Sequence, residues 1–436
     1  MEMGGWVDKV NAVAAIEEIG SSNRGRPRRW RVPTPEVLGV PAYRRLWVAG
    51  LFYYHANTAE IVIAGWSVLQ LTGSALAVGL VGFCRMLPML VLGAVLGSLA
   101  DRFRGHLLLS VVQLVGLFTA ITMTILFTIG GIQLWQIYLL TGIFGCAWTC
   151  DFAARRALIT QIQEPARIAN AMALESVSML ASKIGATALG GWLLAIDGPR
   201  LAYGWLALVY GAGFLATLRM RGDSAVLGHK PPAAVSLIRL VRSGWTTAVG
   251  TPIVRALLLI TVVMNLCVFC YQQIIAVIAG QILLVDSTRM GLLAGADGIG
   301  AIVAASILMT RTTPIPRGRV FLGGATGACV LVILLGASHF YAISLLIQIV
   351  IGACATCFGA MQSTIIAGSI APEMRARAMG ILAMAIGVTP LGILLTGALS
   401  TAIGPSLTLI SLGIAALLLN GAIIAQNRTL LHSEEK

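Results

Sequence analysis

The sequence has few charged residues. Asp, Glu, Lys and Arg make up 11% of its 436 residues, whereas 58% of the residues are hydrophobic. A water-soluble domain cannot bury so large an apolar fraction in its core. The composition therefore excludes an ordinary soluble protein and indicates a polytopic membrane protein, in which lipid surrounds helices that satisfy their own backbone hydrogen bonds.

The sequence also lacks the common motifs of enzyme chemistry. It contains no glycine-rich phosphate-binding loop, no nucleophile elbow and no zinc-binding motif. An enzyme would need a reactive group of side chains at a membrane face, and no such group is visible. We therefore expect no enzymatic activity, no cofactor and no coupling to ATP hydrolysis within this chain.

Two cysteine pairs have the spacing of metal ligands, Cys267 with Cys270 and Cys354 with Cys357. Both pairs lie inside apolar runs without a nearby carboxylate or histidine, so we expect these cysteines to pack as small apolar side chains. Soft-metal transport, which would add the thioethers of Met86 and Met89, is the weaker alternative. We predict no metal site.

Long apolar runs are the dominant feature of the chain. Between Ala75 and Ala100 the sole ionisable residue is Arg85. At ~1.5 Å per residue, such a run is long enough to cross the roughly 30 Å hydrocarbon core of a bilayer. The same pattern recurs and predicts twelve spans, at 46–71, 75–100, 107–129, 133–154, 170–196, 201–219, 255–284, 289–310, 319–338, 341–368, 377–402 and 406–426.

The basic residues follow the alternation of the predicted connections. Nearly all of the 30 Lys and Arg residues fall on the side that holds both termini. The exceptions are Arg85 and Lys183, within spans, and Arg200 and Arg289, on the other side. The positive-inside rule therefore predicts a multi-pass protein of the cytoplasmic (inner) membrane with both termini cytoplasmic. The net charge of +13 then reflects topology, and we expect no nucleic-acid partner.

The spans divide six and six around the longest interior connection. We expect a basic, disordered tail rather than a secretory signal at 1–43, an N-terminal half at 44–219 and a C-terminal half at 253–427. The linker at 220–252 contains an apolar periodicity at 235–245 that predicts an amphipathic helix at the inner surface. A short cytoplasmic tail follows at 428–436.

The two halves resemble each other. Ile162–Met172 and Ile370–Met379 have related sequences, and each leads into a glycine-rich span. Repeated halves are typical of secondary transporters that bind their substrate near the middle of the membrane, between the repeats.

Four short motifs resemble those of a known transporter group. The segment Gly97–Arg104 is similar to the loop signature of the major facilitator superfamily. Three further segments resemble its bacterial branch that includes enterobactin exporters and macrolide efflux pumps: Leu71–Ser74, Arg155–Ile159 and Asn170–Leu174. The similarity extends from about Arg44 to Gln426. It implies an all-α membrane protein with twelve transmembrane helices in two pseudo-symmetric six-helix halves, and secondary transport by alternating access.

The resemblance also implies a gating role for the loop after the second span. Its members here are Gly97, Asp101, Arg102 and Arg104, and Asp101 is expected to meet the amino terminus of the helix that begins near Arg377, with Arg155 or Arg156 as a partner. The helix dipole supplies the positive end of this contact. The alternative is that the loop serves only as a fixed topological anchor.

Ionisable residues within spans suggest two ion pairs. Glu60 and Arg85 lie at similar depth, and Glu60 could carry a proton whose binding alters the attraction between them. A permanent structural pair is the alternative. Lys183 and Asp297 form a second candidate pair across the two halves, although both could instead line the cavity separately. Asp151 and Arg155 have the spacing of an i, i+4 pair, and Glu175 is expected near the cytoplasmic end, solvated or paired with an arginine of the inner loops.

Polar and aromatic side chains of the first, fourth, seventh and tenth spans are expected to line the substrate cavity in this fold. The candidates are Tyr54, Asn57, Trp148, Asn265, Tyr271, Gln272 and Gln362. Aromatic rings with scattered amides suit an amphipathic organic molecule better than a sugar or a phosphate.

The sequence therefore predicts proton-coupled efflux of a small amphipathic organic compound of the drug or siderophore type. The expected partners are this substrate, protons and the lipid bilayer, and we expect a monomer. Proton-linked uptake is the first alternative, because the fifth span lacks the Gly-Pro of the antiporter signature before Gly190 and Gly191. A membrane sensor that no longer transports is the second, because the region at 311–314 lacks the acid of the loop signature.

Overall fold

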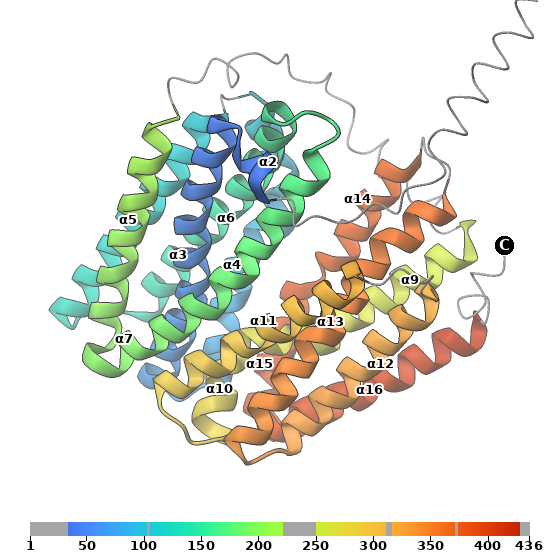
Figure 1. Cartoon of the computed structure of the whole chain (residues 1–436). Helices are drawn as coiled ribbons and strands as arrows, with labels where there is room; N and C mark the ends of the chain where they lie inside the picture. The colour runs from blue at the N-terminus through green and yellow to red at the C-terminus, as the bar shows by residue number, and fades with distance from the viewer. Residues whose placement is uncertain (1–33, 103–104, 221–249, 311–315, 371–373, 428–436) are drawn as a thin grey trace, which may run out of the picture. The chain divides into compact units, whose positions relative to one another are not determined.

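The computed structural model describes residues 34–102, 105–220, 250–310, 316–370 and 374–427 (Figure 1). Within these ranges the side chains of 34, 35, 92–102, 367, 376 and 377 are not described. The predicted amphipathic helix at 235–245 lies outside the described residues. The helices from α3 onward belong to one compact unit of the chain, which begins at Glu36.

The regular structure of the described residues is helical throughout. The N-terminal group of helices, as we call it, follows the short helix α2 (Thr34–Leu38). It comprises α3 (Pro41–Thr72), α4 (Ala75–Arg102), α5 (Gly105–Ile129), α6 (Leu134–Ile162) and α7 (Ile168–Leu218). The kink in α7 lies at Asp197 and Gly198, where Gly198 has φ 64° and Pro199 follows. Glycine adopts positive φ readily and proline cannot donate a backbone hydrogen bond, so α7 consists of two arms that match the two spans predicted there.

The C-terminal group begins with an irregular segment. An α-helix, α9 (Pro252–Val263), is followed by the π-helix η2 (Met264–Val268), the 3₁₀-helix η3 (Phe269–Ile274), the short α10 (Ile275–Val277) and the π-helix η4 (Ile278–Ile282). The remaining helices are α11 (Ser287–Thr310), α12 (Arg317–Ala337), α13 (Tyr341–Ser369), α14 (Arg375–Ile386), α15 (Thr389–Ile403) and α16 (Pro405–Gln426). Sequence periodicity indicated one continuous span where this chain changes helix type several times.

Within the described residues, nine stretches are long and apolar enough to cross a membrane. They are 105–129, 134–162, 168–218, 252–282, 287–310, 317–337, 341–366, 378–403 and 405–426. The long helix α3 and the apolar start of α4 at Ala75–Val91 precede them. Two helices extend well beyond the predicted spans: α3 begins at Pro41 instead of 46, and α6 ends at Ile162 instead of 154. The extensions are helical because buried side chains such as Tyr43, Leu158 and Ile159 pack together there, outside the apolar runs that hydropathy detects.

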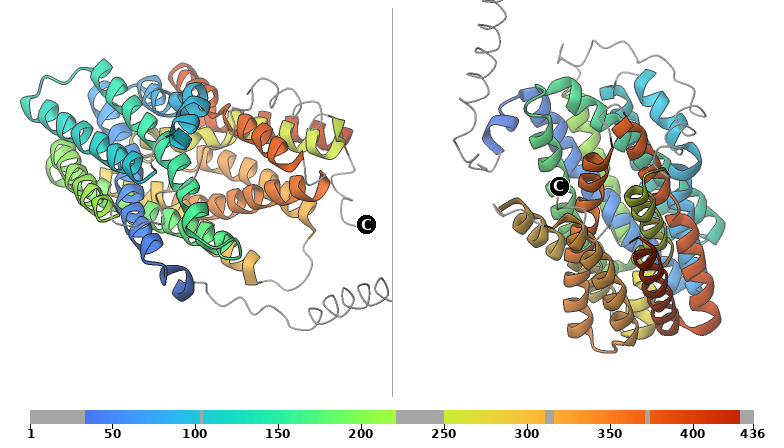
Figure 2. Two further views of the ribbon diagram at one scale, coloured as in Figure 1. Left: turned by 90° about the horizontal axis from the view of Figure 1, so that it is seen from above. Right: turned by 90° about the vertical axis from the view of Figure 1, so that its right-hand side faces the viewer.

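The two groups meet through glycines near one end of the bundle. We call this the short-turn end, because the turns at Gly73, Gly198 and Gly404 lie there, and we call the opposite end, with Leu218 and Pro252, the linker end. A Cβ atom added to Gly79 of α4 would lie 3.1 Å from the Cα atom of Gly397 in α15. Helix α7 contacts α11 in the same way at Gly191 and Gly291. Small residues allow such close approach of two helix backbones. From these contacts the ribbons of the two groups diverge toward the linker end (Figures 1 and 2).

Candidate functional site

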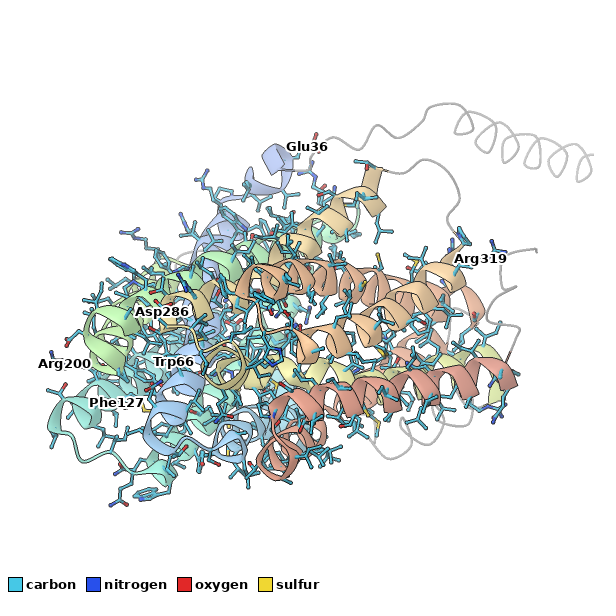
Figure 3. The ribbon with its side chains drawn as sticks, turned by 90° about the horizontal axis from the view of Figure 1, so that it is seen from below. Glu36, Trp66, Phe127, Arg200, Asp286 and Arg319 are labelled. Carbon is cyan, nitrogen blue, oxygen red and sulfur yellow. The ribbon has the colours of Figure 1, made fainter. Side chains whose placement is uncertain are left out.

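Charged side chains occur in two settings in this bundle. Arg200, Asp286 and Arg319 lie at helix ends and are exposed (Figure 3). Among the described residues, the buried Asp, Glu and Arg side chains instead fall into three clusters, each containing an ion pair. Unpaired charges inside a membrane protein are costly, so these clusters are the first place to look for function.

The first cluster lies inside the N-terminal group and joins α3 to α4. Arg85 Nη1 forms an ion pair with Glu60 Oε2, and Arg85 Nη2 donates to the backbone oxygen (2.9 Å) and to Oδ1 (2.7 Å) of Asn57. The exposed fractions of Glu60 and Arg85 are 0% and 2%. Glu60 Oε1 has no hydrogen-bond partner among the described residues. The negative charge of Glu60 is therefore balanced by the guanidinium of Arg85. If Glu60 lost this charge, the guanidinium would keep only its hydrogen bonds to Asn57.

Backbone contact holds Arg85 in place. A Cβ atom added to Gly145 of α6 would overlap the backbone of Arg85, so glycine at this position lets α6 press directly against α4. The fully buried Tyr53 stacks on Trp148 at 6.3 Å between ring centroids, and it contacts Tyr210 edge to face. Interior packing at close to crystalline density restricts any movement of such a cluster.

The second cluster bridges the two groups. Lys183 Nζ of α7 lies 2.5 Å from Asp297 Oδ2 of α11, and Gln272 Nε2 of η3 donates to the same oxygen at 2.7 Å. The side chains of Lys183 and Asp297 are 26% and 7% exposed. Because the two helices belong to different groups, this pair persists only while the groups stay together at this depth.

A small cavity of about 60 Å³ lies beside this bridge. Its walls come from both groups and include the side chains of Lys183, Thr187, Gln272, Gln273 and Gln348. A cavity of this size has room for a few water molecules and is much smaller than the roughly 300–1,000 Å³ of pockets for drug-sized ligands.

The third cluster lies in the N-terminal group toward the linker end. Arg155 donates to both carboxylate oxygens of Asp151, from Nε at 2.9 Å and from Nη2 at 2.6 Å, and from Nη1 to the backbone oxygen of Leu46 at 3.0 Å. Glu175 Oε1 lies 3.4 Å from Arg155 Nε and accepts a hydrogen bond of 2.7 Å from the Tyr54 hydroxyl. Arg155 and Asp151 are 2% and 1% exposed, so one guanidinium is buried between two carboxylates.

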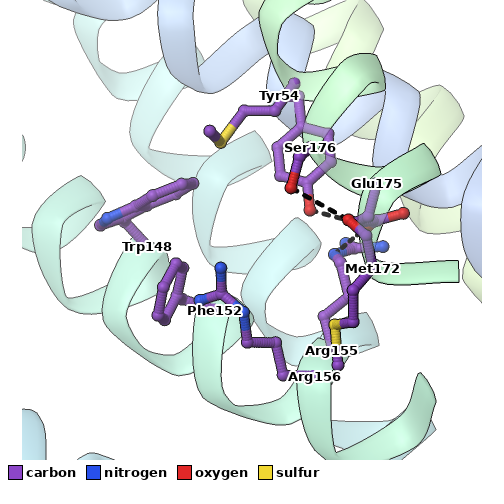
Figure 4. A pocket seen from close by; sticks show the side chains of 9 residues that line it. Tyr54, Trp148, Phe152, Arg155, Arg156, Met172, Glu175 and Ser176 are labelled. Carbon is purple, nitrogen blue, oxygen red and sulfur yellow. Dashed lines mark hydrogen bonds and ion pairs between the residues drawn. The ribbon is translucent and has the colours of Figure 1, made fainter. Parts of the chain in front are cut away.

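A larger cavity of about 210 Å³ opens next to this third cluster (Figure 4). We call it the α6–α7 cavity. Nine residues of α3, α6 and α7 line it: Tyr54, Trp148, Phe152, Arg155, Arg156, Met172, Glu175, Ser176 and Met179. The lining therefore combines aromatic and thioether groups with charged groups. Such a combination favours ligands that are partly apolar and partly polar.

The sequence profile of a major facilitator (MFS) family described as "Transmembrane secretion effector" matches residues 36–436. The chain belongs to this family. It is therefore a membrane transporter of the major facilitator type. It is also 30% identical over 129 residues to an uncharacterized MFS-type transporter, YfiS, of Bacillus subtilis (strain 168), and this alignment covers 30% of each chain.

Solved structures of several transporters share the fold of this chain at low sequence identity. A peptide transporter in complex with alafosfalin has a TM-score of 0.72 at 12% identity, covering 96% of this chain and 99% of that one. A bacterial homologue of the human lysosomal transporter Spinster, inward-facing and unoccupied, has 0.69 at 14%, covering 90% and 98%. The nucleoside transporter NupG has 0.68 at 12%, covering 88% and 98%. Identities this low establish the fold alone.

The structure describes only some of the residues that were expected to form the gate. Arg104 and the side chains of Asp101 and Arg102 lie outside the described residues, and Gly97 is described only as part of the α4 backbone. Arg155 is engaged by Asp151 and Glu175. Arg156 is exposed, with its guanidinium 3.4 Å from the ring centroid of Phe152.

The structure divides the candidate cavity residues between two roles. Tyr54 and Trp148 line the α6–α7 cavity, and Gln272 lines the small bridge cavity. The other four line neither cavity and make buried hydrogen bonds: Asn57 with Arg85, Tyr271 with Gln348, Gln362 with Thr261, and Asn265 with Thr261 and Thr389.

Several lining residues were missed from the sequence. Phe152 lies one helical turn after Trp148, and Met172, Ser176 and Met179 follow one another at i, i+4 and i+7 on α7. This spacing places them on one helix face, and it was the available signal. Met and Phe look like ordinary apolar residues in a membrane span, so only the proximity of α6 and α7 makes the face a cavity wall.

Proposed function

We propose that this protein is a proton-coupled exporter of a small amphipathic organic compound. The observation that carries the proposal is the carboxylate of Glu60, which is completely buried in an apolar bundle and, among the described residues, pairs with one charged side chain, that of Arg85. Intramembrane carboxylates are costly and are commonly retained for proton relay or ion coupling. The proposed direction of transport and the proposed substrate class are supported by the motifs near residues 71–74 and 155–174.

The proposed topology has twelve transmembrane helices in two halves, 44–219 and 253–427. It takes α3 and α4 as the first two spans and the two arms of α7 as two more, and it counts η2 to η4 with α9 as a single span. The linker end then faces the cytoplasm, with both chain termini on that side of the inner membrane, as the distribution of basic residues favours. We expect the protein to act as a monomer.

Glu60 is proposed to exchange protons with the external side. When its carboxylate binds a proton, the ion pair with Arg85 is lost while the hydrogen bonds from Arg85 to Asn57 remain. Removing one charge of a buried pair is strongly unfavourable, by about 3–5 kcal/mol, unless the surroundings rearrange. A conformational change that gives Arg85 access to water or to substrate would relieve this cost, and that is how proton binding would shift the equilibrium between states.

The bridge between Lys183 and Asp297 is proposed to hold the two halves together at mid-depth in the present state. Opening of the short-turn end would separate α7 from α11 and break this pair. The loop with Gly97, Asp101, Arg102 and Arg104 would then close the linker end against the amino terminus of α14, where the helix dipole attracts the acid. Arg156 is the better placed partner for Asp101, since Arg155 is already held by two carboxylates.

Transport into inside-out vesicles tests this function. Candidate compounds, including a siderophore and a macrolide, are offered to vesicles with and without an acidic lumen, for the wild type and for Glu60→Gln. We expect accumulation that requires the acidic lumen and is lost in Glu60→Gln. Substrate-for-substrate exchange without a gradient is the control, because it should persist in a folded variant that has lost only its proton coupling.

The opposite results are equally informative. Gradient-driven accumulation that survives in Glu60→Gln would contradict the coupling role of this residue. Accumulation driven by an alkaline lumen, with substrate moving in the same direction as the proton, would mean proton-linked uptake. Binding of a compound without exchange or accumulation would instead indicate a sensor.

A further inference from the structure

The α6–α7 cavity has an unusual polar feature: a buried carboxylate oxygen that no other group satisfies. Glu175 is 7% exposed. Its Oε1 accepts the hydrogen bond from Tyr54 and lies near Arg155, whereas its Oε2 is buried and has no hydrogen-bond partner among the described residues. Buried polar atoms nearly always have a partner, and a donor on a bound ligand could supply the missing one here.

The neighbouring arginine uses three of its five N–H groups on partners within the protein. The Nε and Nη2 groups of Arg155 donate to Asp151, and its Nη1 group donates to the backbone oxygen of Leu46. A Cβ atom added to Gly50 would lie 2.7 Å from Arg155 Nη1 and 3.2 Å from Glu175 Oε1, so α3 confines both side chains. Two carboxyl groups, those of Asp151 and Glu175, therefore share the one buried guanidinium of Arg155.

The opposite wall suits an aromatic or cationic group. Trp148 and Phe152 of α6 lie 5.7 Å apart between ring centroids, and Met172 and Met179 of α7 also line the cavity. Aromatic faces attract cations, and the guanidinium of Arg156 already lies over Phe152. Because Arg156 is exposed, it marks the rim of the cavity (Figure 4). The charge pattern is therefore negative inside and positive at the rim.

We infer that the α6–α7 cavity binds compounds that combine a protonated amine with an aromatic ring, with the amine donating a hydrogen bond to Glu175 Oε2. The ring lies against Trp148 and Phe152, and any polar or acidic substituent points outward to Arg156. The volume of about 210 Å³ is below the roughly 300–1,000 Å³ of drug-sized pockets, so the cavity takes one end of a larger ligand. This inference rests on the proposed function for its relevance to transport, and it narrows the substrate class to amphipathic amines.

Equilibrium binding of three matched fluorescent probes tests the inference. The probes share a dansyl ring and differ in charge: N-(2-aminoethyl)dansylamide is a cation, dansyl amide is neutral and dansylglycine is an anion. Binding to the purified full-length protein is followed by dansyl emission and by energy transfer from tryptophan. We expect the amine to bind about tenfold or more tightly than the neutral probe, because a hydrogen bond to a charged group contributes at least that factor when desolvated, and the anion to bind weakest.

Glu175→Gln keeps the shape of the side chain and removes its charge. We expect it to weaken binding of the amine about tenfold or more and to leave the neutral probe within about twofold. Glu164→Gln is the matched control, because Glu164 is 73% exposed in its side chain and pairs with Arg167 at the surface. That variant should bind all three probes like the wild type.

A second variant keeps the test decisive if Glu175→Gln proves unstable. Arg156 is exposed, so Arg156→Gln should fold normally, and removal of a cation from the rim should strengthen amine binding about two- to threefold while weakening binding of the anion. Anion binding as tight as amine binding in the wild type would overturn the inference. So would an unchanged amine affinity in folded Glu175→Gln, or weaker amine binding in Arg156→Gln.

These experiments distinguish failure of the proposed amine site from failure of the proposed proton coupling. Glu60→Gln is expected to keep the preference for the amine over the neutral probe, since Glu60 does not line the α6–α7 cavity. Loss of amine selectivity would therefore reject this site and leave proton coupling untouched. Absence of proton-driven transport with amine selectivity intact would reject the proposed function and leave the site in place.

Discussion

Addition of one methyl group at Gly191 should open the short-turn end of the bundle. A Cβ atom there would overlap the backbone oxygen of Ser287 and lie 2.9 Å from the Cα and 3.1 Å from the backbone nitrogen of Gly291. These are backbone atoms of α11, which cannot rotate away as a side chain can. In Gly191→Ala, α7 and α11 must therefore move apart by several tenths of an ångström or more.

The adjacent Gly190 provides a matched control. A Cβ atom there would lie 3.5 Å from side-chain atoms of Ala59 and Ile63, which is ordinary van der Waals contact within the N-terminal group. Overpacking of a well-packed contact costs about 1–3 kcal/mol. If the whole cost falls on the state in which α7 and α11 touch, Gly191→Ala shifts the conformational equilibrium by about 5- to 150-fold, whereas Gly190→Ala shifts it little.

Distances between spin labels measure this shift. Labels at Ile129→Cys and Phe340→Cys would report on the short-turn end, since these side chains are 75% and 71% exposed. The eight native cysteines are replaced first, and the parent must retain the wild-type melting temperature. We expect Gly191→Ala to populate longer distances and Gly190→Ala to match the parent. Identical distributions for Gly191→Ala and the parent, or equal shifts for both variants, would refute the role of this contact.

Three further predictions concern packing and pairing. Gly145→Ala should lower the melting temperature in detergent, because its Cβ atom would overlap the backbone of α4, whereas Gly142→Ala should not, since its Cβ atom would lie 3.6 Å from the nearest atom; equal melting temperatures would contradict this. The single substitutions Lys183→Gln and Asp297→Asn should each lower the stability of the protein more than the double substitution does, because each leaves one charge without its partner. A double-mutant cycle should give a coupling energy of about 1–3 kcal/mol. Additive effects of the two substitutions would contradict the ion pair between these residues. Gly50→Ala should weaken binding of the dansyl amine more than that of dansyl amide, because it displaces the third cluster; an unchanged ratio of affinities would refute this.

Hydropathy located the helices because an apolar segment in lipid must form a helix, in which the backbone N–H and C=O groups hydrogen-bond to one another. The predicted starts and ends near Ala75, Ile129 and Gln426 agree with the structure to within a few residues. The same signal failed at the end of α6, where Leu158 and Ile159 pack against α3 beyond the apolar run. It also failed in the seventh predicted span, since helix type depends on local backbone hydrogen bonding that apolar composition does not specify.

The interior ion pairs could also be predicted from the sequence. Glu60 and Arg85, and likewise Lys183 and Asp297, stand out because few charges occur in the spans, and both pairs are present in the structure. The partner of Glu175 was not specified in advance. Its pairing with Tyr54 and Arg155 depends on the packing of α3 against α6 and α7, which periodicity within one helix does not reveal. Asn265, Tyr271 and Gln362 make hydrogen bonds to other side chains and backbone groups, and their place in a substrate cavity stays a prediction.

Proton movement in a reconstituted system tests the central claim most directly. The purified protein is placed in liposomes with an acidic lumen that contains a pH-sensitive dye, and an amphipathic amine is added outside. Molecules inserted with the linker end outward should raise the pH of the lumen beyond the rise in protein-free liposomes, which passive entry of the neutral amine produces by itself. Glu60→Gln should show only that passive rise. Substrate entry without any proton release, or equal proton release from Glu60→Gln, would contradict proton-coupled export through this residue.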